Sequence, residues 1–210
     1  MAILSVLPLA ILLADPSGAP LESEGWAKAS EGEGVTVYTR PKKGADLSEV
    51  LAVGLVDASP RAIWDMVRDF ASYTKTMPYV EASELLATED GGRVLYAYNR
   101  IAPPLVARRD YILQFTDESA WQEGRGYLKV AWTAVEGRGP APIEGVVRVR
   151  SNVGYWKLEP RDGGKRTLVS YYVFTDPGGA IPRFLVNAAN TSAIPDLFRA
   201  VKRHAREPKN

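Results

Sequence analysis

The chain has 210 residues, of which 46% are hydrophobic and 24% are charged, and these proportions are typical of one well-packed globular domain. Its 26 basic and 25 acidic side chains leave a formal net charge of +1, so no overall field attracts a nucleic-acid backbone. The absence of cysteine excludes disulfide bonds, thiolate zinc sites and cysteine nucleophiles.

The first 20 residues are typical of a secretory leader followed by a linker. Residues 3–14 are largely apolar and precede a turn-rich sequence at 15–18. Such a segment is too short to span a bilayer as a helix, which needs about 20 residues. It fits a signal core that ends near Ala14, although the usual basic residue before it is missing; an uncleaved lipid-proximal anchor and a misassigned start are the alternatives. We expect a periplasmic or secreted protein if the leader is cleaved, a cytoplasmic one otherwise, and a single domain over 21–207.

Beyond the leader, the sequence predicts a short helix over 22–30 around Trp26 and then about nine strands. The strands are predicted at 35–39, 47–56, 80–88, 93–99, 111–116, 127–133, 146–151, 155–159 and 168–175. The turns at 89–92 and 161–164 each contain Asp-Gly-Gly, which suits tight reversals that need a positive φ. Strands joined by such turns pair antiparallel.

Two longer helices interrupt the strands. Ser59 is a favourable N-cap and Pro60 suits the first helical position, which predicts a helix over 60–73. Apolar residues follow at helical spacing: Ile63, Trp64, Val67, Phe70 and Ala71. A second helix is predicted over 182–201. Pro195 should kink or restart it, because proline removes a backbone hydrogen bond and clashes with the preceding turn.

Residues that could support catalysis are scarce. The only histidine, His204, lies in a basic tail, where a solvated helix end is the simpler interpretation. Ser-His-Asp catalysis and zinc ligation by paired histidines are therefore not expected. The glycine pairs at 91–92, 163–164 and 178–179 match neither a phosphate-binding loop nor a dinucleotide fingerprint. The sequence predicts no catalytic residue, no metal and no cofactor.

Several strands carry apolar side chains along one face. The sets that share a face are Tyr111, Leu113 and Phe115; Val94, Tyr96 and Tyr98; and Leu128, Val130 and Trp132. Most such faces pack against a helix in an ordinary core. The stripes alone do not show a cavity.

Three segments in order resemble a known family. They are SPRAIWDMVRD at 59–69 with Tyr73 and Met77-Pro78 following; Arg109-Asp110-Tyr111; and GYWKLEP at 154–160 with DPGGAIP at 176–182 and FLVN at 184–187. In order and spacing, from about Trp26 to Arg203, they resemble the START (StAR-related lipid-transfer) family of the helix-grip superfamily.

The resemblance implies an α+β helix-grip fold, in which a curved antiparallel sheet of about nine strands wraps around a long C-terminal helix. It also implies a cavity that binds a lipid or another large hydrophobic molecule without catalysis. The residues expected to contact the ligand are Tyr96, Tyr98, Leu105, Val106, Leu113, Phe115, Trp132, Phe184, Leu185 and Ala188. The loop at 101–107 is either a lid that touches the membrane or a rigid turn. A monomer with transient membrane contact and no nucleic-acid partner is expected.

One departure from the family concerns its sterol-binding members. They carry a glutamate and a second arginine that face each other inside the cavity, and the matching positions here are Tyr96 and Phe115. Arg109 and Asp110 are interpreted as a structural pair at a strand end. Two alternatives stay open: a polyketide cyclase-like enzyme that uses Tyr96, Tyr98 or Arg108 as a proton donor, and a ligand-free regulatory module.

Overall fold

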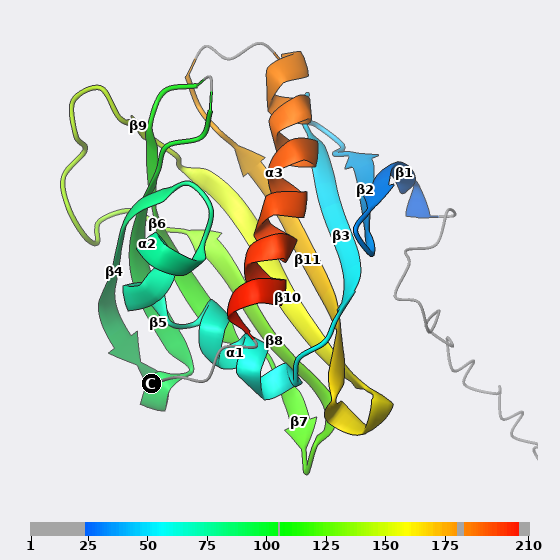
Figure 1. Ribbon diagram of the computed structural model, residues 1–210. Coiled ribbons are helices and arrows are strands. Elements are labelled where there is room, and N and C mark those ends of the chain that lie inside the picture. Colours follow the sequence, from blue (N-terminus) through cyan, green and yellow to red (C-terminus); the bar gives the residue numbers. More distant parts are fainter. Residues whose placement is uncertain (1–23, 105, 180–182, 206–210) are drawn as a thin grey trace, which may run out of the picture.

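The sheet that the hydrophobic alternation predicts is mostly antiparallel and strongly curved (Figure 1). The computed structural model describes residues 24–104, 106–179 and 183–205, and of 183–192 it describes the backbone alone. Over these residues the sheet has 11 strands. They are β1 (Ala27–Gly32), β2 (Val35–Pro41), β3 (Ser48–Val56), β4 (Val80–Glu89), β5 (Val94–Ile101), β6 (Arg109–Asp117), β7 (Ala120–Gln122), β8 (Arg125–Ala134), β9 (Val147–Arg148), β10 (Ser151–Arg161) and β11 (Arg166–Asp176).

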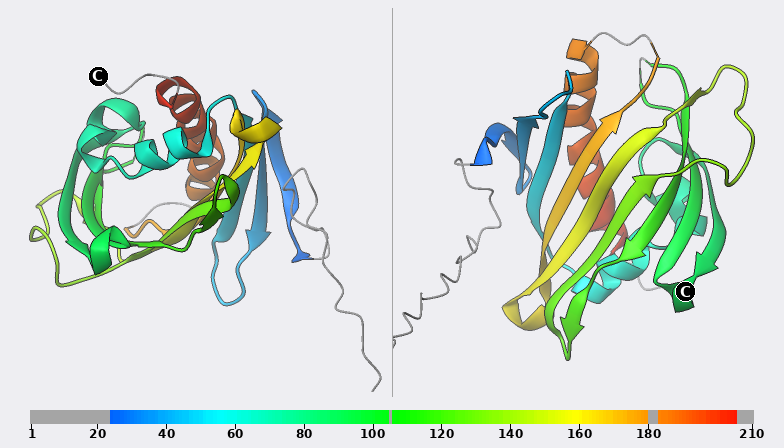
Figure 2. Two further views of the ribbon diagram at one scale, coloured as in Figure 1. Left: turned by 90° about the horizontal axis from the view of Figure 1, so that it is seen from below. Right: turned by 180° about the vertical axis from the view of Figure 1, so that it is seen from behind.

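The first and last parts of the folded chain meet inside the sheet, where β3 pairs with β11. Most strands follow one path, in the order β1-β2-β3-β11-β10-β8-β6-β5-β4. β7 pairs with β8, and the short β9 pairs in parallel with the start of β6. Because β3 pairs with β11, the N-terminal and C-terminal strands form one continuous surface, which curls toward the helices (Figure 2).

The helices lie on the concave face of this sheet (Figure 2). They are α1 (Pro60–Val67), the 3₁₀ turn η2 (Phe70–Ser72), α2 (Tyr73–Thr76) and α3 (Arg183–His204), and two further 3₁₀ turns, η3 (Asp90–Gly92) and η4 (Asp162–Gly164), occupy hairpin ends. β3 lies third from one edge of the sheet and β4 forms the other edge, so the segment 57–79 between them crosses the concave face. The predicted arrangement of a curved sheet around a C-terminal helix is confirmed.

The predicted helix over 60–73 is real at its start but ends early. The Ser59 side chain caps α1 by accepting a hydrogen bond from the Ala62 backbone N–H at 3.2 Å. Asp69 then leaves the helical region, with φ −88° and ψ 72°, and the chain restarts as η2 and α2. The break lets Phe70 and Tyr73 both turn into the core, where the Tyr73 hydroxyl donates to the Val67 carbonyl.

The C-terminal half of α3 packs closely on β3. Ile194, Phe198 and Val201 are buried on one helical face. A Cβ placed on Gly54 of β3 would lie 3.0 Å from the Phe198 ring, so the absence of a side chain at this glycine permits the close approach. Pro195 lies inside α3, which continues past it, so of the two expected effects, a kink or a restart, the restart is wrong.

The predicted helix over 22–30 is also wrong, because the structure places strand β1 at Ala27–Gly32. Trp26 packs on the convex face of the sheet in a small cluster with Leu51, Val53 and Leu168. Its ring makes an edge contact with Tyr172, with centroids 6.4 Å apart. A neighbouring sheet edge therefore overrides the local helical pattern, because pairing with β2 satisfies the backbone while Trp26 is buried.

The remaining sequence predictions differ from the structure mainly at strand ends. The turn residues Asp90, Gly91 and Gly92 have φ values of 49°, 60° and 91°, as the sequence of the turn indicates. The strand predicted at 146–151 is reduced to the two residues of β9, and β7 was not predicted.

Candidate ligand-binding cavity

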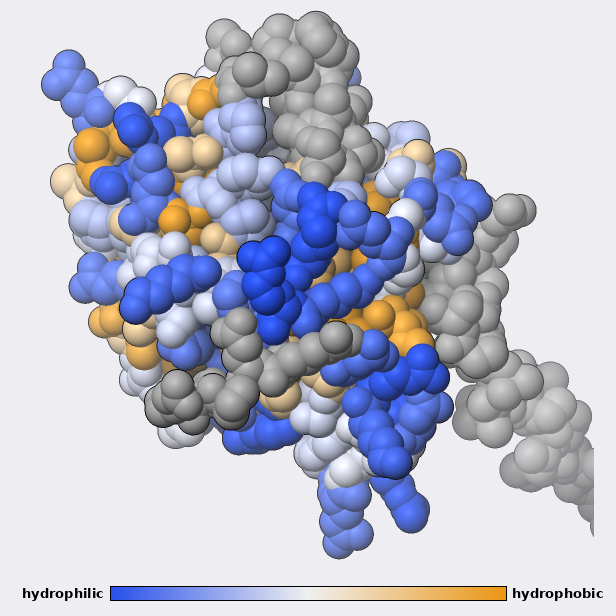
Figure 3. Space-filling view, viewed as in Figure 1, coloured by the Kyte–Doolittle hydropathy of each residue, from blue (hydrophilic) through white to orange (hydrophobic). Residues whose placement is uncertain are grey.

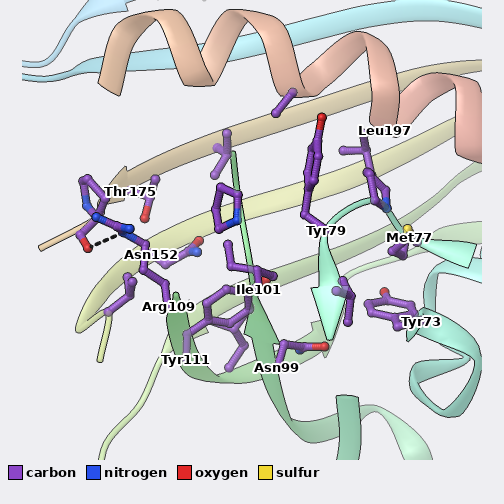
Figure 4. Close-up of a pocket in the computed structure, with 18 of the residues that line it drawn as sticks. Tyr73, Met77, Tyr79, Asn99, Ile101, Arg109, Tyr111, Asn152, Thr175 and Leu197 are labelled. Atoms are coloured by element: carbon purple, nitrogen blue, oxygen red, sulfur yellow. Dashed lines mark hydrogen bonds between the residues drawn. The ribbon is translucent and has the colours of Figure 1, made fainter. Parts of the chain in front are cut away.

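A cavity of about 300 Å³ lies between α3 and the concave face of the sheet. This volume is at the lower end of the range for small-molecule sites. The described residues that line it are Tyr73, Met77, Pro78, Tyr79, Val80, Asn99, Ile101, Pro103, Val106, Arg109, Tyr111, Leu113, Phe115, Trp132, Val149, Asn152, Trp156, Tyr171, Val173, Thr175, Pro177, Ala193, Ile194 and Leu197. Most are apolar or aromatic, and many are drawn in Figure 4.

The period of two in the strands decides which side chains face the cavity. Tyr111, Leu113 and Phe115 of β6 line it, and the residues between them point to the opposite face. On β11 the same alternation brings Tyr171, Val173 and Thr175 to the cavity. The face predicted for Tyr111, Leu113 and Phe115 is therefore confirmed as one surface.

Aromatic rings form a continuous row on the cavity wall, and Phe70 extends this row into the core. Phe70 contacts Phe115 with ring centroids 4.8 Å apart, and Phe115 lies 6.0 Å from Trp132. Trp132 lies 5.7 Å from Tyr171, which in turn lies 4.5 Å from Trp156. Such contacts fix the ring orientations, so this wall has a defined shape before any ligand enters.

One end of the cavity is polar. Figure 4 shows Arg109, Asn152 and Thr175 together at this end, with Tyr73, Met77 and Leu197 at the other. The Arg109 Nε donates to the Pro177 carbonyl at 3.2 Å, and a second N–H of Arg109 donates to the Ala107 carbonyl. The Asn152 Oδ1 accepts from the Trp132 Nε1 at 2.9 Å. The cavity is thus amphipathic along its length.

Burial raises the pKa of two tyrosines of the cavity above the ordinary value. It raises the pKa of Tyr111 to about 12, and burial together with neighbouring Tyr111 raises the pKa of Tyr171 further. Burial also lowers the pKa of Arg109, which nevertheless remains a cation. Of the lining residues that the structure describes, Arg109 is the only one with a charged side chain.

Four of the ligand contacts expected from the sequence lie on the cavity wall: Val106, Leu113, Phe115 and Trp132. Leu105, and the side chains of Phe184, Leu185 and Ala188, lie outside the described residues. Contact between these positions and a ligand stays a prediction.

Tyr96 and Tyr98 are buried but do not line the cavity, which corrects their expected position. Tyr96 pairs with Gln114 and Tyr98 with Ile112, and cross-strand partners project from the same face. That face is the outer one. There the Arg138 guanidinium lies 3.8 Å from the centroid of the Tyr96 ring.

Arg109 and Asp110 do not form the structural pair expected from the sequence, because adjacent strand residues point to opposite faces. Asp110 is fully buried and makes a bidentate ion pair with Arg148 of β9, at 2.7 and 2.9 Å. The Tyr98 hydroxyl donates to the same carboxylate at 3.3 Å. Asp110 therefore anchors β9, whereas Arg109 reaches the cavity.

Several lining residues were absent from the predicted contacts. Tyr111 shares the face of Leu113 and Phe115, and the alternation of Tyr171, Val173 and Thr175 carries the same signal, so both sets were within reach of the sequence pattern. Asn99 had no such signal. It lines the cavity because its partner across the sheet is Tyr111.

Within residues 24–104, 106–179 and 183–205, no group of three or more histidine, aspartate and glutamate side chains could hold a metal ion. None of the helices described for the chain is both long and apolar enough to cross a membrane.

The shape and lining of the cavity suit an elongated ligand with an apolar body and a polar end.

Comparison with known proteins identifies clear relatives. Residues 56–202 match the family model described as "Polyketide cyclase / dehydrase and lipid transport". A protein of Pseudomonas aeruginosa is 31% identical over 170 residues, which are 79% of each chain, and human phosphatidylcholine transfer protein is 26% identical over 87% of this chain and 85% of its own. The crystal structure of a STAR-related lipid transfer protein from Xanthomonas axonopodis superposes with a TM-score of 0.77 and 32% identity, covering 87% of this chain and 99% of that one.

Proposed function

The chain belongs to the family of polyketide cyclases, dehydrases and lipid-transport proteins and to its START members, and from this premise we propose that it binds one lipid or similar hydrophobic molecule and transfers it without chemical conversion. The observation that carries the proposal is the amphipathic cavity between α3 and the sheet. Burial of an acyl chain there stabilises the complex by about 0.8 kcal/mol per methylene, which offsets the cost of leaving a bilayer.

The named relatives support a lipid as ligand. The human relative is a phosphatidylcholine transfer protein, and the Xanthomonas structure is of a STAR-related lipid transfer protein. This chain covers more than four-fifths of the length of both relatives, so the similarity is not confined to a short motif.

The alternative is catalysis of the polyketide cyclase type, which the family description includes. The proton donors considered for it were Tyr96, Tyr98 and Arg108. Tyr96 and Tyr98 face away from the cavity, and Arg108 is exposed and paired with Glu81 at 3.0 Å. These positions favour binding without catalysis.

Ligand entry requires the cavity to open. We assign the gate to the loop at 101–107 and to α3, because Pro103 and Val106 of the loop line the same cavity as Ala193 and Leu197 of α3. Tyr79 connects the two parts: its hydroxyl donates to Asp196 of α3, and its carbonyl accepts from the Ala102 N–H at 2.8 Å.

Transient membrane contact at this gate is part of the proposal, with only a small contribution from the basic end of α3. Arg199 and Arg203 are exposed there, in a part of the surface that Figure 3 shows as mainly hydrophilic. However, Arg199 pairs with Glu33 and Asp196, and Lys202 donates to the Glu33 carbonyl. These contacts hold α3 against the β1–β2 turn and offset part of the charge.

Native mass spectrometry of protein purified from its own host tests the proposal, followed by extraction of what is bound. We expect about one equivalent of an apolar ligand, and saturable uptake of a fluorescent fatty acid, phospholipid or sterol after delipidation. No uptake of any of these classes would contradict it.

Export and a monomeric state also belong to the proposal. The leader at 1–20 lies outside the described residues, so export rests on its composition alone. N-terminal sequencing of protein from fractionated cells tests it, with a new N-terminus after Ala14 or close to it as the expected result. Sedimentation measures the oligomeric state.

A further inference from the structure

Arg109 is a buried cation without a counter-ion among the described residues. Only 4% of its surface is exposed, and its two hydrogen bonds go to the backbone carbonyls of Pro177 and Ala107. Arg148, by contrast, binds both oxygens of Asp110. A guanidinium has five N–H donors, so Arg109 keeps donors that no described protein group satisfies.

A buried charge without an ion pair is unfavourable unless something else compensates it. Carbonyl dipoles provide part of the compensation at Arg109. Because Arg109 lines the cavity, an anion inside the cavity would provide the rest. The planar fork of a guanidinium matches carboxylate and phosphate oxygens in two parallel hydrogen bonds, which a single carbonyl cannot make.

Other polar groups on the cavity wall also lack protein partners. Among the residues that the structure describes, the hydroxyls of Tyr111 and Tyr171 make no hydrogen bond, and both side chains line the cavity. Asn99 is 2% exposed, and its Oδ1 has no hydrogen-bond partner in the part of the chain that the structure describes. Native proteins rarely leave a buried acceptor unpaired, so this oxygen on the cavity wall points to a hydrogen-bond donor on the ligand, separate from an anionic head.

We propose that the cavity selects amphiphiles with an anionic head, either a carboxylate or a phosphate, and that Arg109 binds this head while the chain extends toward Tyr73, Met77 and Leu197. This inference rests on the proposed function and narrows its ligand class. The Tyr111 hydroxyl, on the same strand face two residues from Arg109, is an additional donor for the head.

The test compares ligands that share a chain and differ in the head. Delipidated full-length protein is titrated with dodecanoate, dodecyl phosphate and dodecanol at pH 7. We expect the two anions to bind at least about tenfold more tightly than the alcohol, and Arg109→Gln to abolish this preference without weakening the alcohol. Arg108→Gln, which removes the neighbouring exposed charge, should keep the preference.

Arg109 also donates to two backbone carbonyls, so Arg109→Gln could fail to fold. A second variant tests the inference while Arg109 stays in place. Asn152→Asp is isosteric, retains an acceptor for the Trp132 Nε1, and adds a carboxylate at the polar end of the cavity. It should reduce the affinity for both anions at least about tenfold while dodecanol still binds, because the new charge repels the head and pairs with Arg109.

The outcomes distinguish head-group selection by Arg109 from lipid binding as such. Equal binding of dodecanoate and dodecanol by the native protein would overturn this inference and leave lipid binding intact. Absence of binding by all three ligands would overturn both. Inorganic phosphate that binds as tightly as dodecyl phosphate would show a site for the free anion, and the head-group assignment would then be wrong.

Discussion

The Trp132 indole occupies the space in which any side chain at Gly154 would lie. Trp132 and Gly154 are cross-strand partners on β8 and β10, and a Cβ at Gly154 would lie 2.3 Å from the Trp132 Cζ2. The missing side chain allows the indole to lie flat over β10, where it lines the cavity and contacts Tyr171. Gly154 of β10 therefore shapes the ligand site by determining where the Trp132 indole of the neighbouring strand β8 lies.

Gly154→Ala should accordingly destabilise the protein and change the cavity. The methyl group would also approach the Tyr172 carbonyl to 2.3 Å, so the strand or the indole must shift. We expect a loss of about 1–3 kcal/mol in the free energy of unfolding and weaker ligand binding. Urea unfolding and ligand titration measure the two effects. Gly32→Ala is the matched control, because no atom of the described residues lies within 4 Å of a Cβ at this exposed strand position.

Phe115→Trp should obstruct the cavity. The Phe115 ring lies between Phe70 and Trp132 in the aromatic row, so a larger ring must project into the space for the ligand. We expect at least a tenfold lower affinity with a stability cost of about 1–3 kcal/mol. Tyr96→Trp, which enlarges a buried ring on the opposite face, should keep the affinity. An unchanged affinity in Phe115→Trp, with a cooperative melting transition, would place the ligand elsewhere.

A cross-link across the assigned gate should stop ligand exchange. The chain has no native cysteine, so Val106→Cys and Ala193→Cys would be the only thiols available to a short reducible linker. We expect transfer of a fluorescent lipid between vesicles to cease on linking and to recover on reduction. Transfer at the normal rate by the linked protein would assign the entrance to another part of the molecule.

Val106→Ser alone should slow transfer between vesicles more than it weakens equilibrium binding. The substitution removes an apolar group of the loop assigned to the gate and leaves most of the cavity wall unchanged. Stopped-flow transfer rates and equilibrium titration, measured on the same preparation, separate the two. An equal change in the transfer rate and the equilibrium affinity would indicate that Val106 contacts the bound ligand and has no role in opening the gate.

Acid should remove the contribution of Glu49 to stability. Burial alone would raise the pKa of Glu49, but hydrogen bonds from Arg40, Tyr172 and Lys42 outweigh it and lower the pKa. A carboxyl with a lowered pKa stabilises the fold above its unfolded-state pKa of about 4.3, and this contribution is lost as the pH falls through the folded value.

Unfolding free energies of the native protein and Glu49→Gln should therefore differ most at neutral pH and converge below about pH 4. Tyr172→Phe removes one of the three donors and should reduce the difference in part. A difference that stays constant down to pH 3 would show that ionisation of Glu49 does not contribute.

The sequence was sufficient for the repeating parts of the fold. The period of two in 111–116 placed Tyr111, Leu113 and Phe115 on one face, and Ser59-Pro60 marked the start of α1. The Asp-Gly-Gly turns fixed the hairpin ends, because few other residues adopt positive φ without strain. The segments at 59–69, 109–111 and 154–160, taken in that order, were enough to indicate the family.

The tertiary structure decided which face of each strand meets the cavity. Both faces of β5 are buried, one by the helices and one by the loop that carries Arg138, so hydrophobicity could not distinguish Tyr96 from Asn99. The pairing register with β6 did, since Asn99 lies opposite Tyr111. In the same way, Arg109 and Asp110 acquired different roles only when the strand turned one side chain into the cavity and the other toward Arg148, because neighbouring residues in a strand must point apart.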